Sequence, residues 1–163
     1  MLVTILVTLI FCVIMLCMIW AGVAFHALPK LLGFMPKDIQ EKLKNHKQPF
    51  KGAKAVGLTI IIICVIVLIG TITYAILDGT RNDFGFWQFW MRFLVILYGE
   101  KLFDIVFLDY FLITKTHFFQ HYWPETEGCE GYHQFGFNRN EQVVRIVSYP
   151  FLCALIAWIC TLI

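Results

Sequence analysis

The sequence predicts an all-helical membrane protein, an antiparallel bundle of four transmembrane helices. Of its 163 residues, 60% are hydrophobic and only 15% are charged, whereas a soluble domain carries about 25% charged residues. The apolar residues also occur in long blocks, and an α-helix needs roughly 20 consecutive apolar residues to cross a bilayer. A β-barrel is excluded because the blocks are too long and their residues do not alternate between apolar and polar.

Four apolar blocks are expected to form one transmembrane domain, with spans at residues 2–28, 53–77, 86–114 and 142–162. The third span opens with FGFWQFW, an aromatic cluster typical of a membrane interface. The fourth contains Pro150, which should bend the helix and free the Ile146 carbonyl, and Ser148 is expected to repair the backbone there. Small residues that can mark close helix contacts are Gly22, Gly57, Gly70 and Gly99.

The basic residues predict the orientation of the chain. Seven lysines lie in or beside the first loop, residues 29–52: Lys30, Lys37, Lys42, Lys44, Lys47, Lys51 and Lys54. The loop of residues 115–141 carries Lys115 and Arg139, with Arg145 just inside the fourth span, whereas the short second loop carries only Arg81. Basic loops face the cytoplasm, so both termini are expected outside a bacterial cytoplasmic membrane. This charge is a topology signal, and no nucleic-acid partner is expected.

One stretch of the first loop, PKDIQEKLKNHK at residues 36–47, begins with a proline and permits a helix. It is either a solvated basic loop or a helix on the membrane surface, where its lysines would meet anionic head groups.

The third span differs from the others because it is charged, containing Arg92, Glu100, Lys101, Asp104 and Asp109. A charge near the bilayer centre costs at least ~2.5–3.5 kcal/mol, so these groups must pair or line a wet cavity. At ~100° per residue, one stripe of the helix carries Glu100, Lys101, Asp104 and Lys115. Asp109 falls on the other side, and Arg92 is expected to snorkel to the outer interface.

Two interpretations of this stripe stay open. In the first, Lys101 pairs with Glu100 or Asp104 and locks the third helix into the bundle. In the second, a carboxylate has a shifted pKa and exchanges protons or binds a cation. Candidate catalytic acids are then Asp104, Asp109 and Glu127. Candidate residues for binding a substrate or ion are Glu100, Lys101, Asp104, Lys115 and Tyr149.

The loop after the third span, TKTHFFQHYWPETEGCEGYHQFGFNRNE, carries candidate metal ligands. His117 and His121 share one face if the helix continues to Tyr122, a spacing that suits a shared metal ion. Zinc or iron would be plausible, with further ligands from Glu125, Glu127 or His133. The placement is similar to the H-x-x-x-H boxes of membrane-embedded iron oxygenases, although their further boxes are absent. The alternative is that the histidines bind head groups or loop carbonyls.

Residues 98–138 also carry a recognisable pattern. An FD…LD segment contains Asp104 and Asp109, and a P-x-T-E loop at residues 124–127 and an aromatic-rich stretch follow it. In this pattern the chain resembles a group of small bacterial four-helix integral membrane proteins that have no assigned reaction. The resemblance points to a site at the cytoplasmic ends of helices three and four.

Three functions from different classes remain open. The first is a membrane-embedded enzyme or cofactor protein acting on a lipophilic substrate near the inner leaflet, through the acids and histidines named above. The second is a small proton- or cation-coupled transporter or channel, with Glu100 and Asp104 as coupling carboxylates. The third is an accessory subunit of a larger membrane complex. Membrane lipids are expected partners in each case, and a homo-oligomer is favoured.

Overall fold

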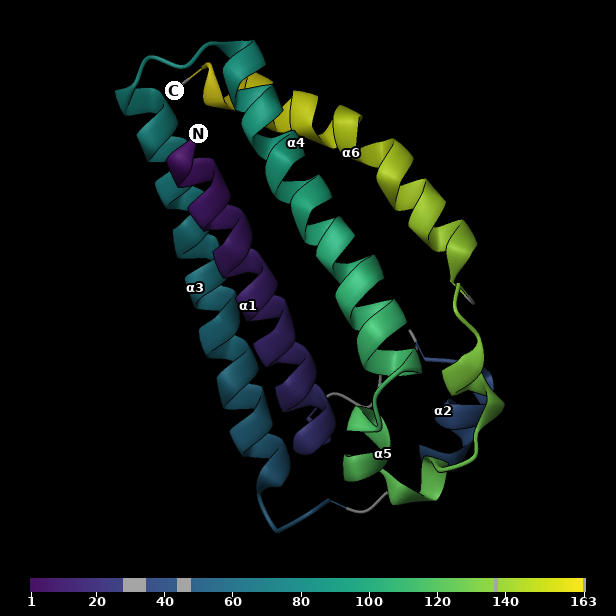
Figure 1. The fold of residues 1–163 in the computed structure, drawn as a ribbon. Coiled ribbons are helices and arrows are strands. Elements are labelled where there is room, and N and C mark those ends of the chain that lie inside the picture. The colour runs from purple at the N-terminus through teal and green to yellow at the C-terminus, as the bar shows by residue number, and fades with distance from the viewer. Residues whose placement is uncertain (28–34, 44–47, 137, 163) are drawn as a thin grey trace. The chain divides into compact units, whose positions relative to one another are not determined.

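The computed structural model describes residues 1–27, 35–43, 48–136 and 138–162, and in these ranges it is helical without a β-strand (Figure 1). Its α-helices are α1 (Leu2–Ala24), α2 (Lys37–Leu43), α3 (Ala53–Arg81), α4 (Phe86–Phe103), α5 (Phe118–Tyr122) and α6 (Arg139–Cys160). A π-helix, η2 (Asp104–Ile113), and two 3-10 helices, η3 (Pro124–Thr126) and η4 (Glu130–His133), complete it. The predicted end of the first span at residue 28, with Lys30, Lys44 and Lys47, lies outside the described residues.

Three helices of the described chain, α1, α3 and α6, are long and apolar enough to cross a membrane. The prediction of an all-helical protein is therefore confirmed, and three of its helices could span a membrane. Helix α4 is not among the three, and it carries the charged residues Arg92, Glu100 and Lys101. The fourth span and the side on which the termini lie stay predictions.

The third predicted span is not one regular α-helix, because α4 ends at Phe103 and η2 follows directly. A π-helix joins residues five apart, so each residue turns the chain by less than the 100° of an α-helix. The charged stripe was predicted at about 100° per residue, and this rotation applies only up to Phe103, the last residue of α4. In η2, Asp109 lies about one turn beyond Asp104. The prediction that Asp109 falls on the opposite side of the helix assumed α-helical winding and is corrected here.

The contacts divide the chain into two compact units. Unit 1 consists of Met1–Ile14, Val65–Phe103 and Arg139–Ile163, and unit 2 of Met15–Cys64 and Asp104–Asn138. Each unit is assembled from segments that are far apart in the sequence.

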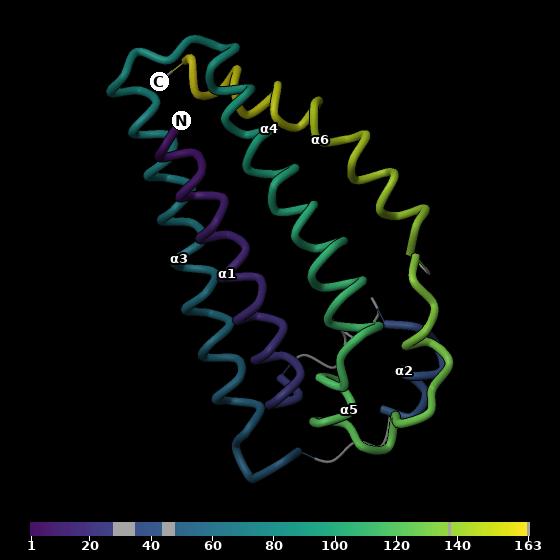
Figure 2. The backbone as a smooth tube through the Cα atoms, in the orientation of Figure 1, coloured from purple at the N-terminus to yellow at the C-terminus, as the bar shows by residue number. Residues whose placement is uncertain are grey.

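In unit 1, α4 packs along α6. The buried core there consists of Val7, Phe11, Ala75, Phe89, Phe93, Ile96, Cys153, Ala157 and Cys160. Helix α6 changes direction along its length (Figure 2), and it contains Pro150. The Ile146 carbonyl is freed as predicted, and it accepts a 3.0 Å hydrogen bond from the Tyr98 hydroxyl. Ser148 does not perform the predicted repair, since its hydroxyl donates to the Arg145 carbonyl at 2.8 Å.

Two of the four glycines predicted to mark close helix contacts do so. A Cβ added to Gly99 would lie 2.6 Å from Thr8 Cγ2, within unit 1. A Cβ added to Gly57 would lie 2.7 Å from the Cβ of Ala27, within unit 2. At the other two glycines an added Cβ would meet nothing within 4 Å, so the sequence alone did not separate contact glycines from exposed ones.

Candidate functional site

The loop after η2 folds, together with α2, into a compact part of unit 2 that we call the loop cap (residues 35–43 and 118–133). Its interior is aromatic, since Trp123 is 0% and Phe119 1% exposed. Helix α2 packs against η3 and η4, and its Ile39 and Leu43 are buried. The stretch is helical over Lys37–Leu43, with its apolar residues buried within the protein and Lys37 and Lys42 exposed. Whether these lysines meet water or lipid head groups stays a prediction.

Hydrogen bonds hold the P-x-T-E segment within the loop cap. The buried Thr126 Oγ1 lies 2.7 Å from both the Trp123 carbonyl and the Tyr132 hydroxyl. The Gly131 N–H donates to the Asp38 carboxylate at 2.9 Å, and this hydrogen bond connects η4 to α2. Burial raises the pKa of Tyr132 to about 12, and the hydrogen bond with Thr126 opposes this shift. The P-x-T-E segment is thus held in place by hydrogen bonds within unit 2.

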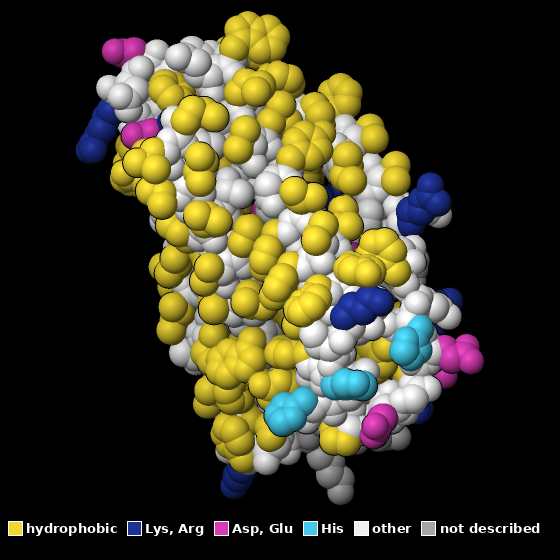
Figure 3. Space-filling view, viewed as in Figure 1, with side chains coloured by type: hydrophobic (Ala, Val, Ile, Leu, Met, Phe, Trp, Pro, Cys, Tyr) yellow, Lys and Arg dark blue, Asp and Glu magenta, His cyan; other side chains and the backbone are white. Residues whose placement is uncertain are grey.

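The loop residues predicted to bind metal or act as acids lie at the surface of the described chain. All are exposed: His117, His121, Glu125, Glu127 and His133. The helix does not continue to Tyr122 as the metal prediction assumed, because η2 ends at Ile113 and α5 starts anew at Phe118. Histidine side chains are visible on the molecular surface in Figure 3. Within the described ranges, no three His, Cys, Asp or Glu side chains form a group that could hold a metal ion.

The predicted charged stripe is divided between the two units. Glu100 and Lys101 belong to unit 1, whereas Asp104, Asp109 and Lys115 belong to unit 2. Lys101 is 3% exposed, and the three acids are half-buried. Lys115 is exposed, with its Nζ 5.3 Å from the centre of the Tyr110 ring. Tyr149, also predicted to bind the substrate or ion, lies in unit 1 with its ring 5.8 Å from that of Tyr98.

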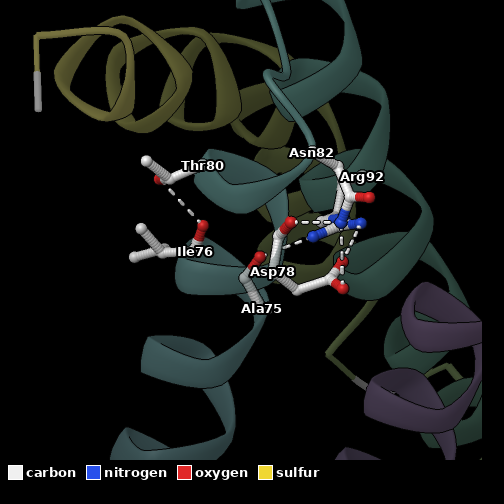
Figure 4. A network of polar contacts seen from close by, with 6 residues as sticks. All are labelled: Ala75, Ile76, Asp78, Thr80, Asn82 and Arg92. Carbon is white, nitrogen blue, oxygen red and sulfur yellow. Dashed lines mark hydrogen bonds and ion pairs between the residues drawn. The ribbon is translucent and has the colours of Figure 1, made fainter.

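Arg92 lies at the centre of a buried polar network in unit 1, and the prediction that it snorkels is wrong. Its side chain is 3% exposed and its Nη2 lies 2.6 Å from Asp78 Oδ2. Nη1 donates to the Ala75 carbonyl at 2.5 Å (Figure 4). Asn82 donates its side-chain amide to the Asp78 carboxylate at 3.3 Å, and the guanidinium carbon lies 4.3 Å from the centre of the Phe84 ring.

A tight turn between α3 and α4 brings Asp78 to Arg92. Asp83 in this turn has a φ of 52°, a left-handed conformation that aspartate tolerates better than most residues. The Gln88 side chain accepts from the Gly85 N–H at 2.7 Å and closes the first turn of α4. Gly79 leaves room for the Phe89 ring, which would collide with any side chain there. Sequence reasoning missed Asp78 because it ended the second span at residue 77, whereas α3 continues to Arg81.

Arg92 also forms part of the wall of a pocket of about 430 Å³ in unit 1. The remaining lining residues are Met1, Thr4, Phe84, Trp87, Gln88, Met91 and Val95. Small-molecule sites typically have volumes of ~300–1,000 Å³, mostly apolar walls and a few polar groups. Among the described side chains that line the pocket, that of Arg92 is charged and the others are apolar or uncharged polar. Trp87 is 70% and Met91 53% exposed, so the pocket opens at the protein surface.

Comparison of the chain with protein-family models, with curated proteins and with solved structures gave no match. The chemistry of the candidate site therefore rests on this chain's own residues, a charge-paired guanidinium in the wall of an apolar pocket. Such a wall can hold a molecule that is apolar over most of its length and polar at one end.

Proposed function

We propose that this integral membrane protein binds a lipophilic molecule in the pocket of unit 1. The observation that carries the proposal is the buried Arg92 guanidinium in an otherwise mostly apolar wall. The apolar side chains suit a hydrocarbon body, and the guanidinium supplies the polar contact that orients a ligand. The lipophilic ligand expected from the sequence is retained, but its site moves from Asp104 and His121 to Arg92.

Binding of this kind is the first step of each function that the sequence left open. An enzyme would convert the bound molecule, a transporter would carry it, and an accessory subunit would hold it for a larger complex. The mostly apolar pocket wall supports binding and favours none of the three later steps.

The pocket test compares two variants that add the same bulk. Val95→Trp fills the pocket from within its wall, whereas Val67→Trp adds an indole on an exposed position of α3 in the same unit. The protein is purified in mild detergent and its bound lipids are counted by native mass spectrometry. We expect the parent chain and Val67→Trp to retain a bound lipophilic molecule and Val95→Trp to lose it. Equal retention by both variants would refute the pocket as the site.

We further propose four spans with the α3–α4 turn outside the cell. Together α4 and η2 cover residues 86–113, more than the roughly 20 residues that a span requires. The lysines of the first loop, to which α2 belongs, favour a cytoplasmic loop cap. A membrane-impermeant maleimide applied to intact bacteria should label Asn82→Cys above the parent's background and leave Glu130→Cys unlabelled. The reverse labelling pattern would invert this topology.

A further inference from the structure

The chain around the start of α3 carries lysines without acidic neighbours. Lys51 precedes α3 and Lys54 lies in its first turn, and both are exposed. The first turn of α3 contains no acidic residue, and among the described residues neither lysine forms an ion pair. Helix α2, in contrast, carries two acids along with its two lysines. The positive charge of Lys51 and Lys54 is therefore not balanced by the chain itself and can meet an external anion.

Exposed aromatic side chains accompany these lysines in unit 2. Phe50, directly before Lys51, is 50% exposed, and its ring centre lies 6.3 Å from that of Phe25. The Phe25 ring centre lies 5.4 Å from that of Trp20, which is 40% exposed. The Trp20 indole N–H donates a 3.1 Å hydrogen bond to the Tyr122 hydroxyl, which connects α1 to α5. We call these neighbouring residues the basic aromatic surface: Trp20, Phe25, Phe50, Lys51 and Lys54.

The basic aromatic surface lies where two helices that could cross a membrane have their ends. Trp20 is near the end of α1, and α3 begins at Ala53 beside it (Figure 1). The 29 residues of α3 extend about 44 Å at ~1.5 Å per residue, whereas the hydrocarbon core is about 30 Å thick. An α3 centred on the bilayer therefore places its first turn in the head-group layer, where aromatic side chains are enriched and lysines meet anionic lipids.

We infer that the basic aromatic surface binds an anionic phospholipid of the surrounding bilayer. The exposed rings suit the boundary between head groups and acyl chains, and the two ammonium groups complement the negative head group. Each lysine close to an anionic membrane surface contributes about five-fold to affinity, so the pair should give a preference of about 25-fold over a neutral lipid. The inference goes beyond the pocket, because this surface belongs to unit 2 and does not involve Arg92.

The test measures the binding of two lipids to the full chain in detergent micelles by native mass spectrometry. Dioleoylphosphatidylglycerol and dioleoylphosphatidylcholine have the same acyl chains, and only the first carries a net negative charge. We expect the parent chain to bind the anionic lipid about 25-fold more tightly. Lys51→Gln combined with Lys54→Gln should bind the two lipids equally. A parent chain without this preference would overturn the inference.

Lys37→Gln combined with Lys42→Gln is the matched control, because it removes the same charge from α2, whose lysines have acidic neighbours. This control should keep the preference for the anionic lipid. An equal loss of preference in the two double variants would overturn the inference, since the net charge of the chain would then decide the preference, and not the basic aromatic surface.

Two further measurements distinguish a lipid surface from a site for any small anion. Glycerol 3-phosphate has an anionic group without acyl chains, so at the concentration of the anionic lipid it should not displace that lipid; displacement would overturn the inference. The anionic lipid should also raise the melting temperature of the parent chain more than that of the Lys51 and Lys54 double variant, and an equal rise would overturn it too. The unit 1 pocket is the same in all these chains, so this inference can fail while the proposed function, tested by Val95→Trp, holds.

Discussion

The two units bury polar groups in different ways. In the loop cap, the Thr126 hydroxyl contacts both the Trp123 carbonyl and the Tyr132 hydroxyl, and the carboxylate of Asp38 is bonded to a backbone N–H. In unit 1, the Arg92 guanidinium is charge-paired with Asp78 and donates to the Ala75 carbonyl. Only the Arg92 network is part of a pocket wall described here. The polar groups of the loop cap join its segments to one another, whereas the Arg92 network joins α3 to α4 and also borders a pocket.

The difference shows that a recognisable sequence pattern and a buried polar network at a pocket need not coincide. The P-x-T-E loop drew attention through its histidines and acids, yet those side chains are exposed, and its buried Thr126 has a structural role. Arg92 looked ordinary in the sequence, because snorkelling explains most arginines near a helix end. Its burial, its pairing with Asp78 and its place in a pocket wall, which the sequence does not display, distinguish it.

The largest expected effect is that of removing the charge partner in unit 1. Asp78→Asn leaves the buried Arg92 charge uncompensated and should cost about 3–5 kcal/mol of unfolding free energy. Asp83→Asn is the matched control, since Asp83 is exposed in the same turn and asparagine also tolerates a positive φ. The unfolding free energies of the two variants are measured by chemical unfolding in detergent micelles. Similar losses in the two variants would show that the Arg92 charge is not buried as described.

The next effect concerns the contact between η4 and α2 in the loop cap. A Cβ on Gly131 would lie 2.5 Å from both Asp38 Oδ1 and Pro36 Cβ, so Gly131→Ala should push η4 from α2. The expected loss is about 3 kcal/mol, at the upper end for overpacking. Gly22→Ala is the control in the same unit, because its Cβ would meet nothing within 4 Å. Gly22→Ala should leave the unfolding free energy unchanged or raise it slightly. An equal loss of unfolding free energy in Gly131→Ala and Gly22→Ala would contradict the close packing of η4 against α2.

The sequence predicted features that depend on local rules. A proline within a helix removes one backbone hydrogen bond wherever the helix lies, so the freed Ile146 carbonyl was predictable. Its acceptance of the Tyr98 hydroxyl was not, because that depends on how α4 and α6 pack. Hydropathy likewise predicted the apolar helices, since burial in lipid demands a minimum length.

Features that depend on helix winding or on a distant partner were not predictable. The change to π-helical winding at Asp104 alters the face on which Asp109 lies, and no residue pattern signalled it. Asp78 and Arg92 lie 14 residues apart on two helices, so their pairing required the turn between them to be known. The network around Arg92 at the other end of the third span could therefore not be predicted from the sequence.

A smaller effect is expected from removing the hydrogen bond between the Thr126 and Tyr132 hydroxyls in the loop cap. Thr126→Val keeps the shape of the side chain but leaves the buried Tyr132 hydroxyl without this partner, at a cost of about 2 kcal/mol. Thr126→Ser retains the hydroxyl and should cost less. If the two groups interact directly, adding Tyr132→Phe to Thr126→Val should cost less than Tyr132→Phe alone. Additive losses in this cycle would rule out the 2.7 Å contact.

The smallest effect is a pH dependence confined to the loop cap. Burial raises the pKa of Tyr132 to about 12, against about 10 in an unfolded chain. The folded state therefore holds the proton more tightly. The stabilisation from Tyr132 is fully present below pH 10 and is lost as the pH rises towards 12. At pH 11 the loss amounts to about 1.4 kcal/mol.

Tyr132→Phe isolates this contribution, because both chains share every other titrating group. The unfolding free energies of the parent and variant are measured in micelles at pH 9 and pH 11, and the parent's value relative to the variant's should fall by about 1.4 kcal/mol. A constant difference would mean that Tyr132 ionises as readily in the folded cap as in the unfolded chain. The cap would then admit water, which contradicts the 2% exposure of Tyr132 and would remove the contrast between a closed cap and an open pocket.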